Sequence, residues 1–333
     1  MERVHQPASP SIRRRGAAVV ALAVALLWVG RTPACDICAV YTATEGRESR
    51  TGILVGVGEQ YTHFGTLQQG GHEVANPAGQ RLDSSITQLL LGYRVSPRFA
   101  GQLNLPFIAR TFRRPEGDRI VDGAEGGVGD MALTAQVLVH HFVTEQSVFR
   151  FSLLGGIKFP TGDPDRLEEE AEEDHEHPTP GVPESGIHGH DLALGSGSFD
   201  GIVGGQVFYS WNRLLLTASG QYAIRTEGAF DYRYANDLTW NVGPGVFALL
   251  AHSYALRAQA VFSGETKGKD EQGGVPADDT GTTVLYLGPA LNFTWGEALV
   301  AEVAADLPVV RHNTALQIVP DFRVRAGVTW RFG

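Results

Sequence analysis

Hydrophobic and polar residues alternate one by one along most of the chain after about residue 50. The last segment shows this most clearly, with one set of apolar positions and one set of mostly polar positions: Phe322, Val324, Ala326, Val328, Trp330 and Phe332 against Asp321, Arg323, Arg325, Gly327, Thr329 and Arg331. A period of two residues is typical of a β-strand with one apolar face. Helical periodicity is nearly absent, so the pattern predicts an all-β fold.

About twelve such segments follow one another, with starts near 52, 83, 98, 128, 147, 198, 213, 236, 253, 282, 297 and 319. The gaps after even-numbered segments are tight, as at Ser96-Pro97. The gaps after odd-numbered segments are long and polar, near 65–81, 113–126, 161–196, 228–235, 265–280 and 310–317. This asymmetry predicts an antiparallel up-and-down transmembrane β-barrel of about 12 strands, with short periplasmic turns and long outer loops. A soluble β-sandwich or barrel explains the alternation equally well, but explains the asymmetry less well.

The first 34 residues differ in kind from the rest. Three arginines at 13–15 precede a short apolar run at 17–29, and Thr32-Pro33-Ala34 follows. This order predicts a secretory signal peptide over 1–34. The apolar run is shorter than the stretch of about 20 residues that a membrane-spanning helix needs. A lipoprotein acylated at Cys35 is the alternative, although Thr32 stands where an aliphatic residue is expected.

The mature part divides into a periplasmic N-terminal segment, 35–50, and the barrel, 51–333. The chain has two cysteines, Cys35 and Cys38, both in the first segment, where an oxidising compartment favours a disulfide between them. Attachment of c-type haem would need a histidine after the second cysteine, and position 39 is Ala. The formal charge of −10 argues against a nucleic-acid partner.

Three glycine- and aspartate-containing motifs punctuate the middle of the chain. They are Gly127-Val128-Gly129-Asp130, then 159–163 (Phe-Pro-Thr-Gly-Asp), then 195–200 (Gly-Ser-Gly-Ser-Phe-Asp). Together with the strand pattern over most of 50–332, they resemble the outer-membrane β-barrels grouped as putative transporters of the phenol-degradation meta-pathway type. Taken alone, the motifs are typical of turns, because Pro ends ladder donation and Gly permits positive φ.

The resemblance implies a location in the bacterial outer membrane and passive passage of small molecules, hydrophobic or aromatic ones included. The expected partners are outer-membrane lipid, the barrel-assembly machinery and a small-molecule solute. An enzyme is not expected, since the chain has no Gly-x-Ser-x-Gly motif and no phosphate loop. Two alternatives stay open: a surface-exposed barrel that binds or senses divalent metals, and a structural barrel that conducts nothing.

Polar residues at alternate strand positions are the candidates for the barrel lumen. They carry both signs of charge, so they either pair across the barrel or line a polar path. The candidates are Gln102, Asn104, Arg150, Lys158, Arg213, Arg225, Asp237, Asn241, Arg257, Glu302, Asp306, Asp321, Arg323 and Arg325.

The gap at 161–196 predicts the longest outer loop, which is acidic and rich in histidine. His175 and His177 form one His-x-His pair, and His188 and His190 form another after a Pro- and Gly-containing bend. Imidazoles at this spacing on a flexible loop chelate borderline metals such as Zn²⁺, Cu²⁺ or Ni²⁺. A solvated acidic loop without a specific metal is the simpler interpretation, and no other cofactor is predicted.

Overall fold

The computed structural model describes residues 51–172 and 183–332. The predicted signal peptide, the 35–50 segment with Cys35 and Cys38, and the histidines His175 and His177 lie outside these residues. Within the described residues, no helix is both long and apolar enough to cross a membrane.

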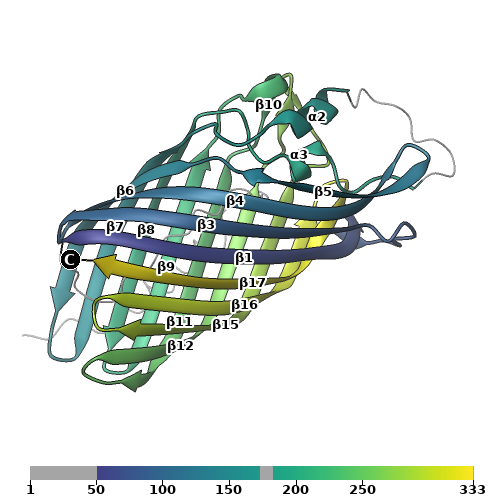
Figure 1. Cartoon of the computed structure of the whole chain (residues 1–333). Helices are drawn as coiled ribbons and strands as arrows, with labels where there is room; N and C mark the ends of the chain where they lie inside the picture. The colour runs from purple at the N-terminus through teal and green to yellow at the C-terminus, as the bar shows by residue number, and fades with distance from the viewer. Residues whose placement is uncertain (1–50, 173–182, 333) are drawn as a thin grey trace, which may run out of the picture. The chain divides into compact units, whose positions relative to one another are not determined.

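The described chain folds into one closed antiparallel barrel with twelve strand positions in its wall. β5 and β6 share one position, because both pair with β4 on the same side, β5 along one half and β6 along the other. The first and last strands pair with each other and close the wall, purple beside yellow in Figure 1. The wall strands are β1 (Gly52–Gln69), β3 (Arg81–Ser96), β4 (Phe99–Glu116), β5 (Arg119–Val128), β6 (Ala132–Val143), β7 (Ser147–Lys158), β8 (Asp200–Trp211), β9 (Leu214–Ile224), β11 (Asp237–Leu250), β12 (Tyr254–Lys267), β15 (Thr282–Trp295), β16 (Leu299–Asn313) and β17 (Leu316–Phe332).

The predicted fold class is confirmed, and most strands begin within a few residues of the predicted positions. Two of the six predicted long loops, 113–126 and 310–317, are wrong. In their place the strands run on to tight turns, at 117–118 between β4 and β5 and at 314–315 between β16 and β17. Polar residues on both faces of these strand ends removed the alternation on which the prediction depended.

The wall is apolar on its outside and polar on its inside. Large hydrophobic side chains point outward along every part of the wall, and residues as large as Leu91, Trp211 and Phe332 are about half exposed. Their neighbours in sequence point inward and are mostly polar or small, as the alternating burial of β3 and β15 shows. A continuous apolar exterior of this kind is characteristic of a surface that contacts lipid rather than water.

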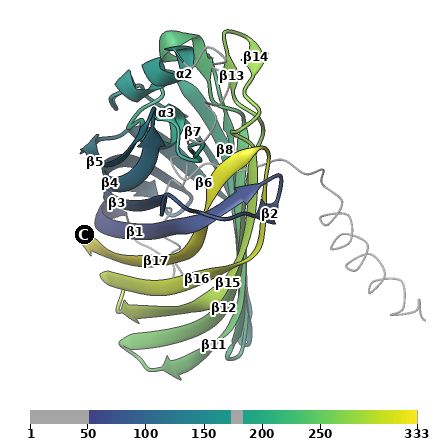
Figure 2. The ribbon, with the colours of Figure 1, turned by 90° about the vertical axis from the view of Figure 1, so that its right-hand side faces the viewer.

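Five tight turns, those that follow β3, β6, β8, β11 and β15, gather at one end of the barrel, called here the turn end. The β4–β5 and β16–β17 turns lie at the other end, together with the shorter elements. These are β2 (His72–Glu73), η2 (Asp165–Leu167), α2 (Glu168–Glu172), α3 (Gly189–Leu192), η3 (Ala229–Asp231), β10 (Tyr232–Arg233), β13 (Glu271–Gln272) and β14 (Val275–Pro276). β10, β13 and β14 form a small separate sheet. Figure 2 shows β13 and β14 on the same side of the barrel as α2.

Residues 161–172 and 183–199, called the plug, fold back against the inner side of the wall. Ile187 and Leu192 are completely buried and pack on Leu82, Phe112 and Ile318 of three wall strands. Part of the predicted outer loop at 161–196 is therefore buried against the wall. The physical reason is that the predicted loop carries isolated apolar side chains, which gain free energy by leaving water.

Candidate solute pathway in the barrel lumen

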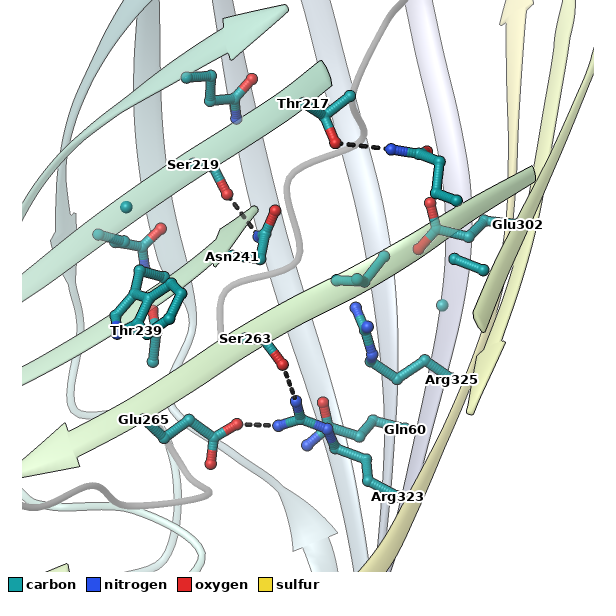
Figure 3. A pocket seen from close by; sticks show the side chains of 18 of the residues that line it. Gln60, Thr217, Ser219, Thr239, Asn241, Ser263, Glu265, Glu302, Arg323 and Arg325 are labelled. Carbon is teal, nitrogen blue, oxygen red and sulfur yellow. Dashed lines mark hydrogen bonds and ion pairs between the residues drawn. The ribbon is translucent and has the colours of Figure 1, made fainter. Parts of the chain in front are cut away.

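A cavity lined by both polar and apolar side chains occupies the barrel lumen below the plug. Its volume is about 170 Å³. At about 15 Å³ for each water molecule, this is room for roughly ten waters. Figure 3 shows side chains from several strands pointing into it. The lining includes Gln60, Thr217, Ser219, Thr239, Asn241, Ser263, Glu265, Glu302, Arg323 and Arg325.

Arg323 organises one side of this cavity. Its Nε donates to Asp306 Oδ2 at 3.0 Å, its Nη1 forms an ion pair with Glu265, and its Nη2 donates to Ser263 Oγ at 3.2 Å. Arg325 shares the same carboxylate, with Nε 2.9 Å from Asp306 Oδ2. One completely enclosed carboxylate thus holds two guanidinium groups against the wall, where the desolvated charges satisfy each other.

A second charged chain runs through four neighbouring strands. Lys158 binds both Asp130 and Asp200, with 2.9 Å between its Nζ and Asp200 Oδ2. Arg225 continues the chain, because its Nη1 lies 2.7 Å from Asp200 Oδ2 and its Nη2 lies 2.7 Å from Asp237 Oδ2. All five side chains are at least nine-tenths enclosed, so positive and negative groups alternate inside the protein.

Asp130 also ties both ends of the plug to the wall. It lies at the break between β5 and β6, and its Oδ1 accepts the amides of Thr161 at 3.1 Å and Gly162 at 3.0 Å. Its Oδ2 accepts the amide of Ser196 at 3.0 Å and the Ser196 hydroxyl at 2.9 Å. The motif residue that sequence analysis interpreted as turn punctuation is therefore the anchor of the plug.

Twelve of the fourteen predicted lumen residues lie on the inner side of the wall or at its rim. Among the neutral ones, Asn104 donates to Gln88 at 3.3 Å and Asn241 donates to Ser219 at 2.6 Å. The twelve are Gln102, Asn104, Arg150, Lys158, Arg225, Asp237, Asn241, Arg257, Glu302, Asp306, Arg323 and Arg325.

Arg213 and Asp321 are the two corrections. Arg213 is exposed in the tight turn between β8 and β9, next to Asn212 with a φ of 52°. Asp321 lies where a bulge interrupts the pairing of β17 with β1, and there it accepts a hydrogen bond from Thr66 at 2.6 Å and binds Arg311 at 2.8 Å. A bulge shifts the alternation by one residue, so counting every second position fails beyond it.

The turn end of the lumen is basic. Arg94, Arg98 and Arg150 line a smaller cavity there, together with Gln136 and Gln206, whose side-chain amides are joined by a hydrogen bond of 3.2 Å. The residues that line this cavity include no Asp or Glu.

The second histidine pair lies inside the plug. The His188 and His190 rings stack at 5.7 Å between centroids, and His190 Nδ1 lies 2.9 Å from Glu170 Oε1. Burial works against the charge on both partners, but His190 lowers the pKa of the Glu170 carboxyl to about 2. Burial likewise opposes charge on His190, and the carboxylates of Asp191 and Glu170 nevertheless raise its pKa well above the usual range. The plug thus contains a buried ion pair.

Comparison with solved structures gives matches among outer-membrane barrels. The COG4313 outer membrane channel from Pseudomonas putida F1 matches with a TM-score of 0.56 and 14% identity, over 87% of this chain and all of that one. The fold is that of an outer-membrane β-barrel. The resemblance predicted from the 127–200 motifs is therefore confirmed at the level of the fold.

Other barrels match more weakly. The β domain of the Bordetella autotransporter BrkA has a TM-score of 0.41 at 9% identity, over 85% of this chain and all of that one. The translocator domain of NalP from Neisseria meningitidis has a TM-score of 0.38 at 12% identity, over 96% of this chain and 95% of that one. No protein-family model matches the chain, and no curated protein sequence matches it significantly.

Sequence reasoning missed three acidic residues of this outer-membrane-type barrel. Asp130 and Asp200 were interpreted as turn residues, and Glu265 was assigned to a loop. All three instead form ion pairs with Lys or Arg side chains on the inner side of the wall. A signal was present for the first two, because both belong to the glycine- and aspartate-containing motifs at strand boundaries. Glu265 gave no such signal, since its partner Arg323 is 58 residues away.

Proposed function

We propose that this chain is an outer-membrane channel through which small molecules pass passively along the barrel lumen. The observation that carries the proposal is the inversion of polarity across the wall. Apolar side chains face outward, where lipid would contact them, and charged and amide side chains face a cavity large enough for water. The barrel-assembly machinery and outer-membrane lipid are the partners that such a location requires.

The lumen offers both polar and apolar groups to a solute. Arg323 and Arg325 are balanced by Asp306 and Glu265, and the rest of the cavity wall combines hydroxyl and amide groups with apolar side chains such as Ile86, Trp240 and Val261. A solute that displaces water from the polar groups must replace the hydrogen bonds of that water, or binding costs free energy. We therefore propose small molecules that carry both polar and apolar groups as the solutes.

The plug limits the size of what can cross. Its buried side chains Ile187 and Leu192 fill the space between the wall strands at one end, and a narrow cavity beside His190 and Asp191 is the opening between plug and wall there. We therefore propose a low-conductance channel whose narrow region is set by the plug.

The test is electrical recording from the purified full-length protein in planar lipid bilayers. The proposal expects discrete conductance steps of constant size. Ser219→Phe should lower the step, because Ser219 lines the cavity and an aromatic ring there narrows it. Leu216→Phe is the matched control, since Leu216 lies on the same strand with its side chain exposed on the outside of the wall.

Absence of conductance steps from correctly folded protein would favour the structural, non-conducting barrel. Folding is checked separately, by β-rich circular dichroism in detergent and by gel migration that changes on heating. Equal steps in Ser219→Phe and wild type would also contradict the proposal, because the cavity lined by Ser219 would then not be the path.

A further inference from the structure

His188, His190 and Asp191 offer three ligand atoms that all lie within 4.8 Å of one another. The two histidines are at least nine-tenths buried and Asp191 is partly exposed. We propose that these residues form a binding site for a divalent cation of the zinc type inside the plug. The proposal does not depend on the proposed channel function, although His190 and Asp191 also line the opening between plug and wall.

His188 supplies the first observation. Its Nδ1 is buried and makes no hydrogen bond among the described residues, although most buried polar atoms have a partner. Asp279 Oδ2 lies 3.3 Å from this nitrogen, in a geometry that is not a hydrogen bond. Zinc bonds of about 2.0–2.1 Å in a tetrahedron place neighbouring ligand atoms about 3.4 Å apart. The His188–Asp279 pair has this separation.

His190 supplies the second observation. Its Nδ1 lies 2.9 Å from Glu170 Oε1, which also accepts the His190 amide at 2.7 Å. Its Nε2 lies 3.4 Å from Asp191 Oδ1 without a hydrogen bond between them. This distance also equals the separation of two ligand atoms around a tetrahedral zinc ion. Histidines that bind metals commonly donate their other ring N–H to a carboxylate, which fixes the ring and makes the ligating nitrogen more basic. Glu170 is in that position.

The backbone holds the ligands in place. Asp191 Oδ2 accepts the His188 amide at 3.0 Å, and the Tyr234 hydroxyl donates to the His190 carbonyl at 3.0 Å. Gly189 stands between the two histidines and approaches the chain so closely that a Cβ there would lie 2.2 Å from the Arg166 carbonyl oxygen. The site is thus built into packed structure, unlike a flexible histidine-rich tract.

The ligand set selects the class of cation. Two imidazoles with one or two carboxylates suit Zn²⁺, Cu²⁺ or Ni²⁺, whereas Mg²⁺ and Ca²⁺ prefer oxygen ligands alone. Asp279 belongs to the 268–281 connection between β12 and β15, so a cation bound by Asp279 as well as by the plug residues would cross-link two separate segments. We expect the bound cation to hold the plug more rigidly in the lumen.

The test uses the full chain in detergent, freed of metal with a chelator and titrated calorimetrically with Zn²⁺. We expect one equivalent to bind tightly, and Co²⁺ in its place to give the intense visible absorption of tetrahedral coordination. The double variant His188→Ala, His190→Ala should bind about 100-fold more weakly or worse. Glu170→Gln should bind about 10-fold more weakly, as outer-shell changes do. The matched control is His175→Ala, His177→Ala, which should bind like wild type.

Equal affinity in wild type and in the 188/190 double variant would overturn the proposal. Loss of binding in the 175/177 variant would overturn it as well, because the tight site would then need the other histidine pair. Each variant must keep the heat-dependent gel migration of the folded barrel. If the 188/190 variant loses this migration, the single variants Asp279→Asn and Glu170→Gln are titrated with Zn²⁺ instead. Unchanged Zn²⁺ affinity in both of them would contradict the proposed site.

Discussion

Replacing Asp130 by Asn should release the plug while leaving the barrel closed. The two side chains have the same shape, but the amide is uncharged and has one acceptor oxygen in place of two. Asp130 now accepts hydrogen bonds from the Thr161, Gly162 and Ser196 amides and binds Lys158. Lys158 keeps Asp200 as its partner in the variant, so the wall should still assemble.

The size of the effect follows from the bonds between Asp130 and the plug. Each hydrogen bond to a charged group contributes about 1.5–3 kcal/mol. The one acceptor oxygen of Asn keeps some of these bonds, and the loss of two of them at the lower value amounts to about 3 kcal/mol. This corresponds to a change of about 150-fold in the equilibrium between docked and released plug.

Single-channel recording measures the release directly. Asp130→Asn should show long visits to a higher conductance level that wild type reaches rarely. Limited proteolysis in detergent gives a second readout, because a released plug exposes backbone that is now packed on the wall. The matched control is Asp122→Asn, since Asp122 binds Arg81 and Arg113 in exposed ion pairs, which contribute about 0–1 kcal/mol.

Conductance and cleavage identical to wild type in a correctly folded Asp130→Asn barrel would refute the reasoning. The plug would then be held by its apolar contacts alone. A barrel that fails to fold would refute it in a different way, by showing that Asp130 stabilises the wall more than the plug.

Three further outcomes are expected. Asp306→Asn should shift the reversal potential in a salt gradient toward anions, because two lumen arginines lose their shared counter-charge. Gly288→Ala should cost about 1–3 kcal/mol in urea unfolding, since its Cβ would meet a carbonyl oxygen at 1.7 Å, whereas Gly220→Ala, with 4.0 Å of clearance, should be neutral. Replacing Cys35 and Cys38 together by Ser should leave heat-dependent migration unchanged, because a disulfide across so short a loop removes little chain entropy.

The faces of the wall strands could be predicted because lipid and lumen impose opposite demands on alternate residues. The same rule failed wherever one of these demands was absent. Beyond the apolar band both faces are polar, so the β4–β5 hairpin was taken for a loop. At the β1–β17 bulge one extra residue interrupts the alternation of inward and outward positions. Counting every second residue across the bulge therefore assigned Asp321 to the lumen.

The plug could not be derived from local sequence. Its burial depends on contacts with wall strands such as those that carry Leu82 and Ile318, and no pattern within 161–196 encodes those partners. The His188 and His190 pair was predicted as a candidate metal ligand from its spacing. Glu170, 20 residues from His190, and Asp279, on another connection, could be recognised only after folding brought them together.

The pairing of β1 with β17 has a consequence for how the chain folds. Val55 lies opposite Trp330, so the seam joins residues separated by nearly the whole barrel sequence. Closing a loop of that length costs about 5 kcal/mol of chain entropy before the seam forms any bond. Contacts this distant in sequence make folding slow.

Until the last strand is synthesised and delivered, the first strand and the penultimate one both expose unpaired amides, which hydrocarbon penalises by several kcal/mol each. Insertion is therefore close to all-or-none. A chain that ended before β17 could not persist as a shorter barrel, and we expect it to remain a substrate for chaperones and proteases instead.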